Sequence, residues 1–241
     1  MCETLDLITP LDHVTDIASR LLNLTSAHIE VANNSASTCH QAQILLREEV
    51  SGRAQQLWSN GTEGPVILLH DNNSSNRDSH DSPRQREQSS QTVGFNKRPE
   101  GFCIDRDGLN LIVTGNDSRG VLYGVGWLIR HLEIRRSSVL LPDSLLSSGS
   151  YRSAPVYSLR GHQIGYRPKT NSYAGWTVVE WEQYIRDLII FGANAIEIIP
   201  PKSDDLRDSD HFPLPPLDMM TKVSAIAELY DLDLWIWFPA L

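Results

Sequence analysis

The sequence predicts an α+β N-terminal domain over residues 1–150, followed by the start of an α/β domain over residues 151–241. The length of 241 residues allows two small domains. Two strand patterns and a helix pattern follow one another between residues 102 and 132, which is typical of an α+β domain. Beyond Pro155 strand and helix patterns alternate, and this alternation predicts parallel βαβ units.

The first part of the chain carries short patterns of different kinds. Residues 10–22 place apolar side chains at helical spacing and predict an amphipathic helix. Residues 27–32 alternate apolar and polar side chains, as a short strand does, and the aliphatic run at residues 65–69 predicts a buried strand. Residues 41–58 have a mixed periodicity that indicates no single element.

A long polar segment interrupts this domain. From His70 to Thr92 the sequence contains no aliphatic side chain and no Phe, Trp or Tyr. Such a segment cannot bury enough apolar surface to offset the entropy that is lost on ordering. We therefore expect a disordered insertion, which we assign to residues 70–97.

A hairpin and a helix are predicted after the insertion. Residues 102–105 and 109–114 form two strand patterns joined by an Asp-Gly dipeptide, which strongly favours a tight hairpin. Residues 116–118 offer Asn, Asp and Ser as caps for a helix whose apolar face extends over residues 121–132. Residues 139–142 predict one more strand.

The second domain is predicted from alternating patterns. Residues 144–155 are rich in serine and predict a linker. The patterns beyond it predict strands at residues 156–165, 195–199 and 232–238 and helices at residues 177–191 and 217–230. Three parallel strands with an open apolar edge are not expected to form a finished domain. The chain is therefore predicted to be the front part of a longer protein.

Composition and charge exclude several function classes. Lys and Arg total 21 against 30 Asp and Glu, so the formal charge is −9, and a nucleic-acid backbone would be repelled. No run approaches the roughly 18 consecutive apolar residues of a membrane span. The three cysteines match neither a disulfide framework nor a metal motif. The N-terminus does not begin as a secretory signal does, so the chain as written is expected in the cytoplasm.

Two segments resemble known carbohydrate-active enzymes. The run Gly-Asn-Asp-Ser-Arg-Gly-Val-Leu-Tyr-Gly-Val-Gly-Trp-Leu-Ile-Arg at residues 115–130 resembles the small α+β domain that precedes the catalytic barrel in family 20 β-hexosaminidases and family 67 α-glucuronidases. Residues 158–167, 184–188 and 191–197 resemble the first strand, first helix and second strand of the TIM (β/α)8 barrel in the same enzymes. The resemblance implies a glycoside hydrolase that needs no cofactor, with this chain holding the first strand-helix units of an incomplete barrel.

The resemblance also implies a role for one residue. In the hexosaminidases, the Arg of an Arg-Gly pair on the first barrel strand binds sugar hydroxyls, and Arg160 with Gly161 matches that pair. The family pattern continues with Leu-Asp and a further Arg, whereas this chain has Ile164-Gly165, and Pro168 where the Arg would stand. The catalytic Asp-Glu pair of the family follows the fourth barrel strand, beyond the end of this chain.

Carboxylates are the first candidates from chemistry alone, because a glycosidase needs two of them around the bond that breaks, except where the substrate itself provides the nucleophile. Glu197 lies in the second predicted barrel strand and could point into the barrel. The alternative is a buried carboxylate paired with a basic neighbour. Asp204 and Asp205 lie in the segment after that strand, where a solvated acidic loop is the alternative.

Aromatic residues are the second candidates, since sugar rings stack on indole and phenol rings. Trp235 and Trp237 lie on the third predicted strand, and we expect one to face the barrel interior and the other the helices. Trp237, nearer the carboxyl end, is the candidate sugar contact, with plain packing as the alternative. Tyr166, Tyr173 and Trp176 lie in the segment after the first strand and are candidate ligand contacts.

Two basic residues on the first strand complete the candidate site. The guanidinium of Arg160 offers a rigid fork of donors for sugar hydroxyls or a carboxylate, and an internal salt bridge with Glu197 is the alternative. His162, two residues further on, could donate to a sugar hydroxyl or be a core histidine. The expected partner of the site is a carbohydrate, and the sequence does not indicate an oligomeric state.

Two functions remain open from the sequence. The first is the N-terminal part of a glycoside hydrolase that acts on an oligosaccharide or polysaccharide. The second is a non-catalytic product, either truncated or a carbohydrate-binding or scaffold relative. The matching segments and Arg160 favour the first, whereas the absence of an acid pair from this sequence favours the second.

Overall fold

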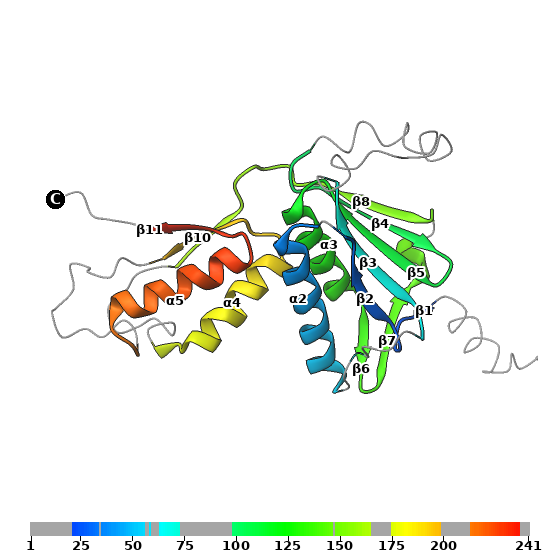
Figure 1. Ribbon diagram of the computed structural model, residues 1–241, viewed down its shortest axis with the longest axis horizontal. Coiled ribbons are helices and arrows are strands. Elements are labelled where there is room, and N and C mark those ends of the chain that lie inside the picture. Colours follow the sequence, from blue (N-terminus) through cyan, green and yellow to red (C-terminus); the bar gives the residue numbers. More distant parts are fainter. Residues whose placement is uncertain are drawn as a thin grey trace, which may run out of the picture.

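The computed structural model describes residues 21–33, 35–55, 58, 63–72, 98–146, 148–164, 175–198 and 213–236. A five-stranded sheet with two helices on one face forms the first part of the molecule (Figure 1). A second sheet of three strands, with two further helices, packs beside those helices. No helix in these ranges has the length and apolar character that would let it cross a membrane.

The five-stranded sheet contains all the strands that the sequence predicts before residue 115. Its strand order is β2-β3-β5-β4-β8. The strands span His28–Val31 (β2), Val66–Asp71 (β3), Phe102–Asp107 (β4), Asn110–Gly115 (β5) and Ser150–Ser153 (β8). β4 and β5 form the predicted antiparallel hairpin, with Gly108 at a φ of +61° in the tight turn. β2, β3 and β5 are parallel to one another.

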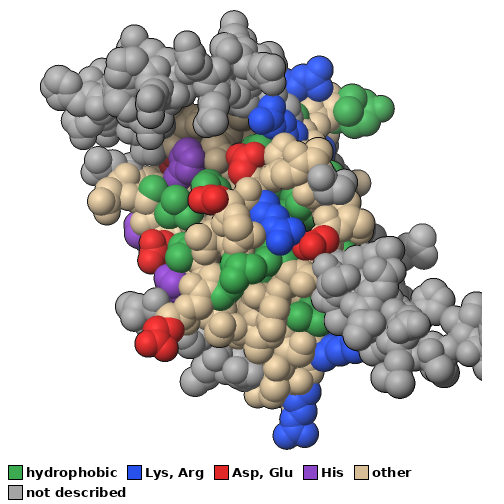
Figure 2. Space-filling view, turned by 90° about the vertical axis from the view of Figure 1, so that its right-hand side faces the viewer, with side chains coloured by type: hydrophobic (Ala, Val, Ile, Leu, Met, Phe, Trp, Pro, Cys, Tyr) green, Lys and Arg blue, Asp and Glu red, His purple; other side chains and the backbone are tan. Residues whose placement is uncertain are grey.

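Two helices cover one face of this sheet, α2 (Ser37–Ala54) and α3 (Ser118–His131). Asp117, one of the predicted caps, accepts a hydrogen bond from the Gly120 backbone N–H at 2.8 Å and so begins α3. The other face carries polar pairs such as His28–Glu30. Figure 2 shows charged, histidine and apolar side chains mixed across it.

The two strands that follow α3 pair with a strand near the start of the described chain in a small antiparallel sheet. It has the strand order β1-β7-β6, with bounds Leu21–Asn23 (β1), Glu133–Arg135 (β6) and Ser138–Pro142 (β7). β7 confirms the strand predicted at residues 139–142, and a short 3-10 helix, η3 (Asp143–Leu146), comes after it.

The second part of the chain alternates strands and helices, as predicted. The elements are β9 (Gly161–Gln163), α4 (Val178–Ile190), β10 (Ala195–Ile198), α5 (Pro216–Leu229) and β11 (Asp233–Ile236). All three strands are parallel, in the order β11-β10-β9, which confirms the predicted βαβ units. β9 is much shorter than the strand expected at residues 156–165.

Several expectations about the first part are wrong. Leu21 and Leu22, the end of the helix predicted at residues 10–22, belong to β1, because they pair with β7. The rest of that helix lies outside the described residues. His70 and Asp71 continue β3, although the polar insertion was expected to begin at residue 70. Residues 73–97 lie outside the described ranges.

Two further elements were not predicted. The supposed linker at residues 144–155 contains β8, which pairs with β4, and Tyr151 of β8 stacks on Trp127 with ring centroids 4.5 Å apart. α2 fills most of the segment of mixed periodicity. Its buried side chains at Cys39, Ala42 and Leu46 have helical spacing. The sequence pattern did not indicate this helix, because two of these side chains are small and because the helix begins at Ser37, before the segment of mixed periodicity.

A close contact between α3 and α4 joins the two parts. Gly126 of α3 lies against the backbone of Ile190 at the end of α4, and a Cβ atom at this glycine would be 2.7 Å from the Ile190 carbonyl oxygen. No real Cβ makes such a contact with backbone, so a larger residue would push the helices apart. Gly126 is thus needed for the close packing of α3 on α4.

This contact predicts opposite effects for two glycine substitutions. Gly126→Ala should lower the free energy of unfolding by about 1–3 kcal/mol, because the helices must separate. Gly52→Ala in α2, where no atom lies within 4 Å of the added Cβ, should raise it by about 0.5–1 kcal/mol. Urea denaturation of both variants measures the difference, and equal effects would contradict this account of the α3–α4 contact.

Candidate functional site

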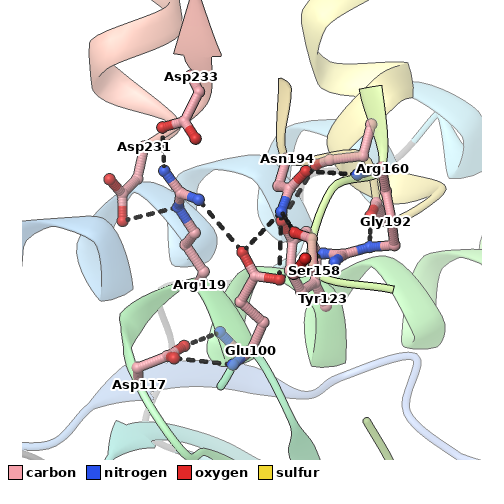
Figure 3. Close-up of polar contacts among 12 residues, drawn as sticks. Glu100, Asp117, Arg119, Tyr123, Ser158, Arg160, Gly192, Asn194, Asp231 and Asp233 are labelled. Atoms are coloured by element: carbon pink, nitrogen blue, oxygen red, sulfur yellow. Dashed lines mark hydrogen bonds and ion pairs between the residues drawn. The ribbon is translucent and has the colours of Figure 1, made fainter. Parts of the chain in front are cut away.

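A buried carboxylate organises a polar cluster at the amino ends of β9, β10 and β11 (Figure 3). Glu100 is only 8% exposed. Its oxygens lie 3.2 Å from Arg119 Nη1 and 2.7 Å from Arg160 Nη2, and Asn194 Nδ2 donates to it at 3.1 Å. Two cations and an amide therefore surround one carboxylate, which offsets the cost of burying its charge.

Arg119 extends the cluster from α3 to β11. Its Nη2 donates to Asp233 Oδ1 at 2.6 Å, and its Nε lies 3.4 Å from Asp231 Oδ2. Burial opposes the charge of this guanidinium, but its hydrogen bonds to Asp233 and Glu100 and the nearby carboxylate charges together raise the pKa of Arg119 above its usual value. Arg119 is therefore a fixed cation.

Asn194 holds the strand ends together. Its Oδ1 accepts from the Arg160 backbone N–H at 2.8 Å, and its Nδ2 donates to the Ser158 carbonyl at 2.6 Å. Its backbone carbonyl accepts from the Asp233 N–H at 2.9 Å. This buried amide thus satisfies both of its polar atoms while it aligns the starts of all three strands.

Arg160, the best candidate from the sequence, lies inside this cluster and is held there by protein groups. Besides Glu100, its Nε donates to the Gly192 carbonyl at 2.7 Å and its Nη1 to the Tyr157 carbonyl at 2.8 Å. The guanidinium carbon lies 5.2 Å from the centre of the Tyr123 ring. Arg160 therefore pairs with Glu100 and not with Glu197, the partner that the sequence offered as the alternative. This geometry favours a structural role, because all three guanidinium nitrogens lie within 2.8 Å of protein oxygens.

A second group of residues lies on the open face of the three-stranded sheet. Gln163, Glu197 and Trp235 stand at one register position across β9, β10 and β11. Ile196 and Ile198 are buried in the core, so the alternate residues of β10 point to the face away from the helices. We call Gln163, Glu197 and Trp235 the open-face row. Glu197 is half-buried, and Trp235 is 54% exposed.

The open-face row offers three kinds of polar and apolar contact. The carboxylate of Glu197 can accept hydrogen bonds, the amide of Gln163 can both donate and accept, and the indole of Trp235 presents an apolar face. This combination suits a ligand with hydroxyl groups on an otherwise apolar ring. Glu197 was predicted, whereas Gln163 and Trp235 were not chosen from the sequence. Their common register with Glu197 becomes visible only once the strands are aligned.

His162 and Trp176 belong to an aromatic cluster on α4. His162 Nδ1 meets the hydroxyl of Tyr184, and burial raises the pKa of Tyr184 to about 12. The ring of Trp176 lies 5.4 Å from Trp181 and 5.1 Å from Tyr184, measured between centroids. The structure therefore places His162 on the helix side of the sheet, and Trp176 is half-buried against α4. Their roles as ligand contacts stay predictions.

The remaining candidates lie outside the described residues. These are Tyr166, Tyr173, Asp204, Asp205 and Trp237.

The expectation that Trp235 and Trp237 face opposite sides of the strand is wrong in principle, because residues two apart on a strand share a face. Within the described ranges, no three or more His, Cys, Asp or Glu side chains gather in a way that could hold a metal ion.

Comparisons with known proteins identify a similar fold. No family model and no curated protein matches this chain. The GH20 β-N-acetylhexosaminidase from Streptomyces coelicolor is similar in structure with a TM-score of 0.60 and 12% identity, over 90% of this chain and 42% of that chain. CpGH84B has a TM-score of 0.58 and 18% identity, over 90% of this chain and 34% of that chain. A GH20 exo-β-N-acetylglucosaminidase from Vibrio harveyi, in complex with N-acetylglucosamine, has a TM-score of 0.58 and 12% identity, over 90% of this chain and 33% of that chain.

These similarities concern the fold alone, because the identities are low. This chain spans between 33% and 42% of the length of these structures. It has a mixed α/β fold, with α2 to α5 among its described elements, similar to parts of the GH20 and GH84 proteins.

The cluster predicts how Arg160 contributes to the protein. Arg160→Ala should lower the free energy of unfolding by about 2–3 kcal/mol, because Glu100 stays buried with fewer partners. Arg135→Ala is the matched control, since its pair with Glu133 is exposed and should contribute no more than about 0.5 kcal/mol. Chemical denaturation measures both. If Arg160→Ala keeps the stability of the unaltered chain and only loses saccharide binding, Arg160 is a ligand contact instead.

Proposed function

We propose that this chain is the carbohydrate-binding front part of a glycoside hydrolase. Residues 1–150 would form the domain that precedes the catalytic barrel, and residues 151–241 the first units of a (β/α)8 barrel. The observation that carries the proposal is the open-face row, set on parallel strands whose other face is covered by α4 and α5. The fold similarity to GH20 and GH84 proteins supports it. The resemblance to α-glucuronidases stays a prediction.

The packing of the last units supports a continuing barrel. α5 packs on α4 and on β11, and β11 pairs within the described residues with β10. A groove of about 550 Å3 lies beside α5 and β11, with Leu217, Met220 and Ile236 in its lining. Leu217 is 70% exposed and Ile236 39%. A further strand and helix, packed as β11 and α5 pack on β10 and α4, would cover these side chains.

The open-face row supports a carbohydrate as the ligand. In a (β/α)8 barrel, ligands are bound at the carboxyl ends of the strands, and Gln163, Glu197 and Trp235 lie in the carboxyl halves of β9, β10 and β11. Trp235 would stack on a sugar ring while Glu197 accepts from its hydroxyls. Most glycosidases hydrolyse with two carboxyl groups around the scissile bond, and in this proposal the catalytic carboxyl groups come from outside the described residues.

A titration with the β-linked trimer of N-acetylglucosamine tests the ligand. The sugar is chosen because one similar structure holds N-acetylglucosamine. Trp235→Ala should weaken binding about tenfold, since a stacked aromatic contributes about 1 kcal/mol or slightly more. Leu229→Ala on α5 is the control, because Leu229 is as exposed as Trp235 but lies in the helix layer. Chemical-shift perturbation measures both, and equal affinities for the two variants would refute the role of the open-face row.

The proposed barrel also predicts association of the isolated chain. The groove beside α5 and the edge of β11 should make the chain associate at high concentration, because nothing in the described part of the chain covers these apolar groups and this strand edge. Ile236→Lys in the groove should shift the chain toward monomer in sedimentation velocity. Val179→Lys on α4, where Val179 is 74% exposed and outside the groove, should not. A monomeric unaltered chain at all concentrations would contradict the proposal.

A further inference from the structure

An open cleft lies at the amino ends of β9, β10 and β11, where the strands meet the start of α3. Its volume is about 810 Å3. Its charged lining consists of two guanidinium groups and four carboxylates, from Arg98, Arg119, Glu100, Asp117, Asp231 and Asp233. The open-face row occupies the other halves of the same strands, so the cleft is a separate place on the molecule.

Two carboxylates keep an oxygen available in the cleft. Asp231 contacts Arg119 through its Oδ2 atom, and Asp233 contacts Arg119 through its Oδ1 atom. In the described part of the chain, the second oxygen of each carboxylate makes no further hydrogen bond. The side chains of Asp231 and Asp233 are 43% and 53% exposed. A ligand in the cleft can therefore donate to both without displacing the cluster.

An exposed aromatic ring lies at the rim of the cleft. Tyr157 lines it and is 74% exposed. The Tyr157 carbonyl accepts from Arg160 Nη1 at 2.8 Å, so the backbone that carries the ring is held by the buried cluster. A ring on a held backbone can stack on a ligand without the entropic cost of ordering that backbone.

The charges and contacts of the cleft favour a neutral ligand with hydroxyl groups over an anion or an apolar ligand. A phosphate or other anion would meet four carboxylates against two guanidinium groups and would be repelled. A purely apolar ligand would leave the carboxylates without their water and without a partner. A neutral ligand with several hydroxyls and an apolar ring face satisfies both the available oxygens and the tyrosine ring.

We propose that this cleft is a second saccharide-binding site, formed by Tyr157, Asp231 and Asp233 at the amino ends of the strands. Its ligand class follows from the chemistry of the cleft, so the proposal does not depend on the open-face row. It gives the junction of the two parts a binding role besides its structural one.

Four variants of the full chain test the proposal, titrated with the β-linked trimer of N-acetylglucosamine and with its cellulose counterpart, cellotriose. Tyr157→Ala and Asp231→Asn should each weaken binding at the cleft about fivefold to tenfold, read from the backbone amide shifts of Ser118, Arg119 and Asp233. Leu159→Ala is the matched control, because Leu159 is exposed in the same segment as Tyr157 but does not line the cleft. Trp235→Ala should leave the affinity of the cleft unchanged.

The outcomes separate this proposal from the proposed function. Shifts at the cleft that weaken in Tyr157→Ala but not in Leu159→Ala support the second site, whatever happens at Trp235. Shifts confined to the strands around Trp235 would overturn the second site and leave the open-face row intact. No shift at the cleft with either trimer at millimolar concentration would also overturn it, as would cleft affinities unaltered by Tyr157→Ala and Asp231→Asn.

Discussion

The buried carboxylate of Glu100 is the interaction on which the arrangement of this molecule depends. A carboxylate removed from water is stable only where cations and donors replace the lost hydration. Here they come from α3, from the start of β9 and from the start of β10, through Arg119, Arg160 and Asn194. None of these elements can shift relative to the others without leaving a charge unpaired. The position of the parallel strands is therefore set from their amino ends.

A further arginine, Arg186, links the same two parts at another point. Arg186 of α4 reaches Glu48 of α2 at 2.6 Å and Glu182 of its own helix at 2.9 Å. Gly126 of α3, the helix that carries Arg119, lies close to the backbone at the end of α4. Two polar junctions and a backbone contact together restrict both translation and rotation. The open-face row consequently keeps one orientation relative to the five-stranded sheet.

The sequence predicted the elements whose patterns are local. The hairpin, α3 with its Asp117 cap and the parallel βαβ units each follow from spacing or capping within a few residues. β8 was missed because its stability comes from pairing with β4 and from Tyr151 on Trp127, which no local pattern reveals. The same holds for the site. Arg160 was recognised as important, but its partner Glu100 lies 60 positions earlier in the sequence, and only the fold brings the two together.

The backbone of Glu100 limits how this protein can change during evolution. Its φ of 61° lies in the left-handed region, where glycine or asparagine is at ease and a glutamate is held at some expense of strain. Glycine would relax the backbone but remove the carboxylate, asparagine would be too short and uncharged, and glutamine would keep the length but leave Arg160 without its counter-ion, while Arg119 would keep Asp231 and Asp233. Each of these three substitutions is unfavourable, so Glu100 and Arg160 are expected to change together.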